Sequence, residues 1–230
     1  MNELRSDVVI NRALLTNPAL DSGAIAVRGT VFHVFGEAGD HDVAILRDGR
    51  VAGRFTVAVQ PEGAVPQVNV DLAGLAADAD RSGNITAHYA VREGGVMGFH
   101  VGQGIGRYAV VIGHTAGGGS RTVLDSRGQL PAGDLFAVTL ITPGTYRATN
   151  LTTQARLPIT VAMPGRGEPY RPARPTLVRA GDHGFDPAAA HILAGQSIVL
   201  LAETPPASSS SPRRLISRIP ICARGRSDSP

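Results

Sequence analysis

The chain has 230 residues, of which 43% are hydrophobic and only 4% aromatic, and its formal net charge at pH 7 is +3. This hydrophobic fraction excludes wholesale disorder, and the absence of Trp predicts a core of Val, Leu, Ile and Ala. The single cysteine, Cys222, excludes an internal disulfide, a cysteine-based zinc site and a thiol redox pair.

The positive charge lies mainly near the C-terminus. All 22 basic residues are Arg, which indicates a GC-rich, bacterial genome, and residues 205–230 hold five of them against one Asp. The rest of the chain is therefore close to neutral. Because nucleic-acid-binding proteins cluster cations on a folded face, we expect no nucleic-acid partner.

The N-terminal region carries no readable targeting signal. Residues 1–20 contain no apolar run that would make a signal peptide, and no stretch of about 18 apolar residues is present for a membrane span. We expect a cytoplasmic protein, or an extracytoplasmic one if a leader is missing. Residues 1–23 are interpreted as an N-terminal extension.

From residue 24 onward the pattern is typical of β-strands. Ile25, Val31 and Phe35 fall on one parity, as expected for a half-buried strand. The dipeptide Asp48-Gly49 stands between two apolar runs and predicts a hairpin, because it accepts the positive φ angles of a tight turn. Residues 71–77 predict one short helical turn. Together these elements predict a first β-sandwich block over residues 24–92.

Residues 93–164 predict a second block of strands, separated by Gly, Pro and Asp turns. The expected strands are 96–101, 107–113, 120–125, 134–141, 144–149 and 157–162. A linker rich in Pro and Arg follows at residues 165–176. Residues 177–204 begin a third β module with too few strands to bury its apolar face, so we expect self-association through exposed strand edges.

Residues 205–230 differ in character from the rest of the chain, being rich in Ser, Pro and Arg. One interpretation is a disordered basic tail, and the other is a reading-frame shift that replaced the remainder of the third module. We favour the second because that module begins and is not completed. Sequencing the gene with its downstream DNA distinguishes the two.

Two segments resemble the cupredoxin-like family. Residues 133–147 contain a strand, a Pro-Gly-Thr-Tyr turn and the start of a second strand, and residues 184–200 resemble the family's opening hairpin. The resemblance implies a cupredoxin-like sandwich in which Tyr146 fills the core while its hydroxyl finds a partner. A blue-copper site takes a thiolate, two imidazoles and usually a Met, whereas residues 147–156 contain no Cys, His or Met. The scaffold is therefore expected without its copper site.

Two histidines form a candidate metal site. His100 and His114 flank a predicted hairpin centred near Gly106, so the two side chains could meet across adjacent strands. A pair of imidazoles binds Cu(II) or Zn(II) weakly. The alternative interpretation gives both histidines a structural or surface role.

Residues 78–86 resemble the first nine positions of an EF-hand calcium loop. Asp78, Asp80 and Ser82 supply oxygens at the required spacing, and Gly83 stands at the sharp turn. However, Tyr89 occupies the place of the bidentate carboxylate, and the flanking residues predict strand. A polar Asx-type turn is the alternative that these departures favour.

No pattern of catalytic residues is present. The chain has no Gly-x-Ser-x-Gly elbow and no matched acid and base, and its Gly-rich stretches lack the helix that a phosphate-binding loop needs. We therefore expect an all-β protein with two short antiparallel sandwich blocks, the second cupredoxin-like, and an incomplete third module. It is interpreted as a non-catalytic binding or structural module for an unknown protein or small ligand, with no cofactor. The alternative is a metal-binding protein.

Overall fold

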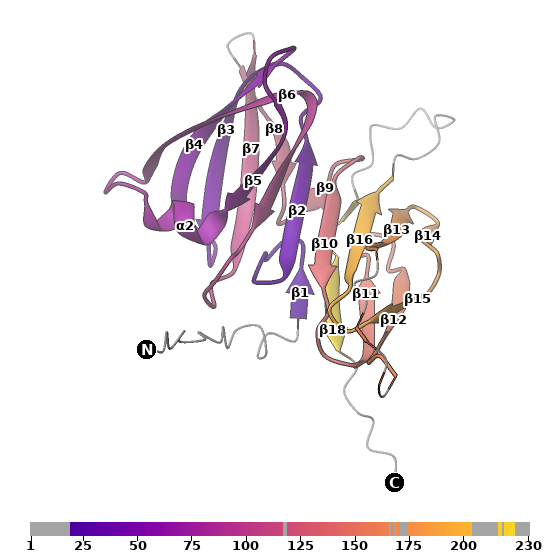
Figure 1. Cartoon of the computed structure of the whole chain (residues 1–230). Coiled ribbons are helices and arrows are strands. Elements are labelled where there is room, and N and C mark those ends of the chain that lie inside the picture. The colour runs from indigo at the N-terminus through magenta and orange to yellow at the C-terminus, as the bar shows by residue number, and fades with distance from the viewer. Residues whose placement is uncertain are drawn as a thin grey trace, which may run out of the picture.

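The computed structural model describes residues 19–116, 119–165, 167, 169–170, 174–203, 216–217 and 219–223. Strands make up 62% of the chain and helix 3%, which confirms the all-β prediction. The strands form one large sheet, one smaller sheet and a separate short pair (Figure 1). No helix in the described part of the chain is long and apolar enough to cross a membrane.

The larger sheet has eleven strands. Across the sheet they lie in the order β14 (Gly184–Asp186), β13 (Thr176–Gly181), β16 (Ser197–Ala202), β10 (Leu135–Thr139), β2 (Gly29–Val34), β6 (Asn84–His100), β4 (Arg50–Gln60), β3 (Gly39–Arg47), β7 (Tyr108–Ala116) and β8 (Gly119–Asp125), while β5 (Val65–Asp71) pairs with β6. The long strand β6 joins the parts of the sheet, because its first half pairs with β4 and its second half lies between β2 and β5.

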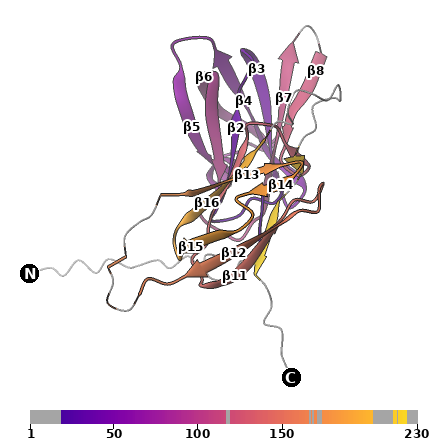
Figure 2. The ribbon, with the colours of Figure 1, turned by 90° about the vertical axis from the view of Figure 1, so that its right-hand side faces the viewer.

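The smaller sheet has five strands and lies against one end of the larger sheet. Its order is β1 (Ala19–Asp21), β18 (Pro220–Ala223), β11 (Gly144–Thr149), β12 (Arg156–Ala162) and β15 (Ala190–Leu193). Figure 2 shows it as a second layer beside β16, β13 and β14. The separate pair consists of β9 (Gln129–Leu130) and β17 (Ile216–Ser217).

Alternating burial along the strands produces the core between the layers. In β10, Phe136 and Val138 are buried while their neighbours in sequence are partly exposed, and β12 buries Leu157 and Ile159 in the same way. Successive side chains of a strand point to opposite faces, so one face of each sheet supplies the apolar contacts.

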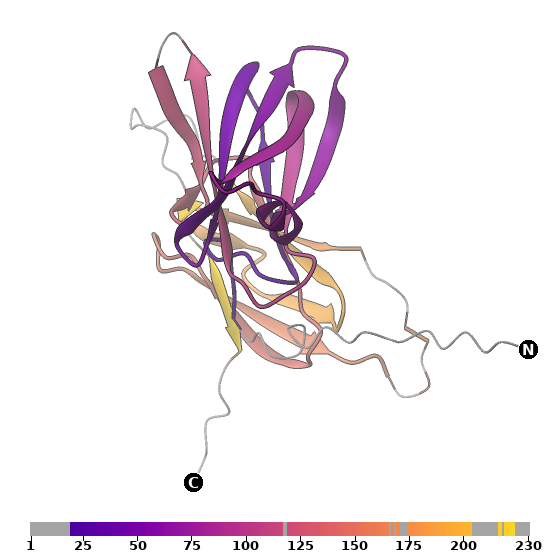
Figure 3. The same ribbon diagram turned by 90° about the vertical axis from the view of Figure 1, so that its left-hand side faces the viewer.

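The Asp48-Gly49 turn and the short helix form as the sequence predicts. Asp48 and Gly49 have φ angles of 50° and 82°, and they join β3 to β4 in an antiparallel hairpin. The helix α2 (Leu72–Ala77) begins after Asp71, whose side chain accepts a hydrogen bond from the Ala73 amide. It lies at one end of the curved strands (Figure 3).

Tyr146 on β11 is buried, and its hydroxyl donates a hydrogen bond of 2.8 Å to the carbonyl oxygen of Thr142. This contact fastens the turn at 142–145 to the strand that follows it. The buried ring and the bonded hydroxyl agree with the expectation that Tyr146 fills the core while its hydroxyl finds a partner.

The division into two sandwich blocks does not describe this architecture. Strand β6 runs without interruption through the expected boundary at residues 92 and 93. The two-layer part of the protein instead combines β1 and β2 with β10 to β16 and β18. Strands β3 to β8, which lie between β2 and β10 in the sequence, extend the larger sheet. The pairing of β2 with β10 joins residues about a hundred positions apart, which local sequence patterns do not encode.

The third module and the tail also differ from their expected state. Strand β16 lies between β10 and β13, and β15 pairs with β12, so the strands expected to lack partners have them. Within residues 205–230, β18 pairs with both β1 and β11, and its residue Ile221 is buried together with Ile219, which precedes the strand. The expectation of disorder therefore does not hold for Pro220–Ala223. The linker at 165–176 lies partly outside the described residues.

Candidate functional site

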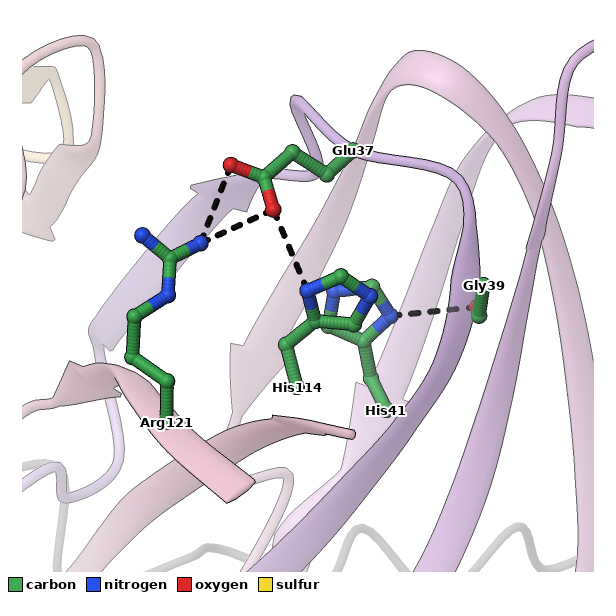
Figure 4. Close-up of polar contacts among 5 residues, drawn as sticks. All are labelled: Glu37, Gly39, His41, His114 and Arg121. Atoms are coloured by element: carbon green, nitrogen blue, oxygen red, sulfur yellow. Dashed lines mark hydrogen bonds and ion pairs between the residues drawn. The ribbon is translucent and has the colours of Figure 1, made fainter. Parts of the chain in front are cut away.

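Four charged or titratable side chains from four elements meet at one end of the β3–β7–β8 part of the large sheet (Figure 4). Glu37 comes from the loop between β2 and β3, His41 from β3, His114 from β7 and Arg121 from β8. His41 is the register partner of His114, and His114 is the partner of Arg121. We call these four residues the histidine cluster.

Strand alternation places the two imidazoles of the cluster in the interior. On β3, His41 shares its face with Val43 and Ile45, and all three are buried. On β7, His114 has the same relation to Ile112. Since side chains two residues apart point to one face, both rings continue an apolar stripe of the core.

The two imidazole rings are stacked. Their centroids are 4.4 Å apart and their planes differ by 10°, with His41 2% exposed and His114 7% exposed. Phe35 packs against His41, with ring centroids 5.0 Å apart and the two planes at 86°. His41 donates from Nδ1 to the carbonyl oxygen of Gly39 at 3.2 Å. Burial lowers the pKa of His41, and the nearby His114 and His33 act in the same direction.

Glu37 covers the stack on its solvent side. Its Oε2 lies 3.1 Å from His114 Nδ1, and a single terminal nitrogen of Arg121 lies 2.8 and 2.9 Å from its two carboxylate oxygens. The hydrogen bond and the charge of Arg121 hold the pKa of Glu37 below its usual value. The carboxylate is therefore ionised over the range in which histidine titrates.

A second polar pair lies deeper in the protein. His33 Nδ1 is 2.8 Å from Asp134 Oδ2, and the amide of Val34 donates to Asp134 Oδ1 at 3.0 Å. Asp134 is 1% exposed, and this burial raises its pKa although the bond to His33 opposes the change. The His33 ring also meets Phe35 edge-on at 4.8 Å, so Phe35 separates this pair from the stack.

The arrangement can hold and exchange protons, but it lacks a nucleophile. In the described part of the chain, the hydrogen-bond partners of His33, His41 and His114 are carboxylates and a backbone carbonyl, with no hydroxyl or thiol among them. Stacked rings also direct their in-plane lone pairs along parallel planes, which do not converge on one ion. Consistent with this, the described residues contain no group of three or more His, Cys, Asp or Glu arranged to hold a metal ion.

The predicted histidine pair is not brought together. His100 ends β6, where its register partners are Thr30 and Asp71, whereas His114 on β7 faces His41. Strands β4 and β3 lie between β6 and β7 in the sheet. The expected hairpin around Gly106 does not form because β7 pairs with β3 and not with β6.

The predicted calcium loop folds as a tight polar turn. Asp78 is the exposed C-cap of α2, and Asp80 Oδ1 accepts hydrogen bonds of 2.8 Å from the amides of Ser82 and Asn84. Gly83 has a φ of 78°, the left-handed region that favours glycine. The Asp80 oxygen at the centre of the motif is thus directed at the backbone, as in the Asx-type alternative.

The sequence gives no indication of three residues of the cluster as candidate site residues: Glu37, His41 and Arg121. The alternation of His41 with Val43 and Ile45 is the signal that could have placed His41 on a buried face. Nothing local predicts its contact with His114, which depends on strand pairing. In comparisons with known proteins, no protein-family model, no curated protein and no solved structure matches this chain.

Proposed function

We propose that this protein is a non-catalytic binding or structural module whose two-layer part is a cupredoxin-like sandwich. Three features support the family likeness: the five-stranded layer, the strand at 135–139 leading into the turn and strand at 144–149, and the hydrogen bond from Tyr146 to Thr142. Cys222 on β18 is the register partner of Arg147, but residues 147–156, which follow Tyr146, contain no Cys, His or Met, so electron transfer through copper is not part of the proposal.

The observation that carries the non-catalytic role is how the buried polar side chains are used. Among the described residues each buried polar or charged side chain forms a hydrogen bond or ion pair within the protein. Most of these bonds join segments far apart in the sequence, whereas those of His41 and Asn150 are made to residues two or three positions away. Ser126, for example, accepts from the Val110 amide at 2.9 Å, and Ser22 accepts from the Ile219 amide at 3.0 Å. The set is Ser22, His33, His41, His114, Ser126, Asp134 and Asn150.

Buried polar groups bonded in this way stabilise a fold, because an unpaired one would cost about 1–3 kcal/mol. A catalytic group instead keeps an atom aimed at a cleft that substrate can enter. The internal bonds therefore favour a scaffold whose interactions are made at its surface. The metal-binding alternative has no comparable support, given the stacked imidazoles and the backbone-bonded Asp80.

Metal analysis with activity measurements tests the proposal. Protein purified without chelators should contain no stoichiometric copper, zinc or calcium, and an excess of each metal chloride should leave the midpoint of thermal unfolding unchanged. His114→Gln and Asp80→Ala proteins are the matched variants. One metal per chain that either variant loses would overturn the proposal, as would an esterase or phosphatase activity of the wild type that His114→Gln lacks.

A further inference from the structure

The histidine cluster joins the loop before β3 and the strands β3, β7 and β8 at one place. The His41 and His114 positions are the last register pair of the β3–β7 ladder, and Arg121 continues the row onto β8. Glu37 brings the loop at residues 35–38 to the same place. The end of this sheet is therefore closed by side chains whose charge depends on pH.

The stack is compatible with neutral rings and not with two charged ones. The His41 Nδ1 hydrogen is committed to the Gly39 carbonyl, so a second proton would have to enter at Nε2 inside the buried stack. Two imidazolium rings with centroids 4.4 Å apart would repel strongly in a region of low dielectric.

The surrounding charges do not balance a doubly protonated stack. Glu37 is the carboxylate in contact with it, and Arg121 already neutralises that carboxylate. On the other side, His33 adds a third titratable ring behind Phe35, and its carboxylate partner Asp134 contacts His33 and not the stack. Protonation of both stacked rings would therefore leave a net positive charge in the cluster.

We propose that the His41–His114 stack is a pH-sensitive latch that holds the loop at 35–38 and the β7–β8 hairpin against β3, and that acid opens it. The latch is closed while both rings are neutral. Below the ordinary histidine pKa the unfolded or opened segment takes up protons that the closed stack excludes, so closure weakens as the pH falls. The lowered pKa of His41 predicts the same direction. A histidine whose pKa is lower in the closed state stabilises that state fully above about pH 6.5, and this stabilisation is lost as the pH falls below it.

Hydrogen exchange across the pH range tests the latch. After correction for intrinsic exchange, amides at residues 39–43 and 112–115 of the wild type should exchange about tenfold faster at pH 5 than at pH 7, with the rest of the fold unchanged. In His41→Phe the ring stays and the proton site is removed, so protection should be retained at pH 5. The matched control, His88→Phe on β6, alters an exposed histidine and should respond as the wild type does.

Two further measurements separate the latch from a merely structural role. Glu37→Gln removes the carboxylate that contacts the stack and would offset positive charge on it, so local opening should begin at a higher pH than in the wild type. NMR titration of the wild-type protein should show the His41 ring taking up a proton in the pH range of the opening, even if His41→Phe fails to fold. Full amide protection with His41 protonated would overturn the proposal, as would an equal acid response in wild type and folded His41→Phe.

Discussion

Strand β18 provides a direct test of whether the C-terminal segment belongs to the fold. Ile221 is 0% exposed and lies between Leu20 of β1 and Ala148 of β11 in the smaller sheet. Replacing a fully buried Ile by Ala removes its transfer free energy and leaves a cavity, which costs about 2–5 kcal/mol. Because β18 is the only strand pairing with β1 among the described residues, we expect Ile221→Ala to lose about 3 kcal/mol.

Urea unfolding followed by circular dichroism measures this loss. With a slope of about 2 kcal/mol per molar, the midpoint of Ile221→Ala should fall by about 1.5 M. Ile105→Ala makes the same change at a side chain that is 87% exposed, and its midpoint should stay within about 0.3 M of the wild type. If the two variants unfold together, β18 is not packed and the C-terminal segment is dispensable, contrary to the structure.

Three other substitutions test the polar contacts. Tyr146→Phe should lose about 1 kcal/mol of stability with its hydrogen bond to the backbone, and an equal loss in the partly buried Tyr89→Phe would contradict that assignment. Asp134→Ala should lose about 3 kcal/mol, the low end for removing one partner of a buried pair, because removal also recovers a desolvation cost. Since the pKa of Asp134 is raised in the folded protein, its contribution to the free energy of unfolding declines as the pH rises above about 4. Urea unfolding at several pH values should therefore show a smaller difference in stability between wild type and Asp134→Ala at higher pH. Asp80→Ala should lose about 1 kcal/mol through its two backbone hydrogen bonds, and added calcium chloride should leave the wild-type midpoint unchanged; a calcium-dependent increase would restore the metal interpretation.

Features encoded within a few residues were predictable. Asp48-Gly49 identifies a hairpin because the required φ angles belong to those two residues, and Asp71 identifies the start of α2 through its own side chain. The strands at 144–149 and 157–162 follow from alternation in their own sequence. Each of these signals depends on contacts made by residues close together in the chain.

The composition of the C-terminal segment, residues 205–230, in contrast, did not predict the strand that forms within it. Its Arg, Ser and Pro content predicts disorder, and only four of its residues, Pro220–Ala223, form β18. The side chains of Ile219 and Ile221 are buried because β1, about two hundred residues earlier, lies beside them. Composition averages over a segment, whereas burial depends on what the rest of the fold places next to each residue.

The candidate site shows the same division between local and tertiary information. The sequence by itself determined an all-β protein, the Asp48-Gly49 turn and the start of α2, and its alternation over 41–45 holds an unused signal for the burial of His41. Only the tertiary structure decided that His41 faces His114, that Glu37 and Arg121 close the pair, and that His100 lies elsewhere. The physical reason is that alternation fixes which face a side chain occupies, while strand order and register fix its neighbours, and these follow from packing the whole chain.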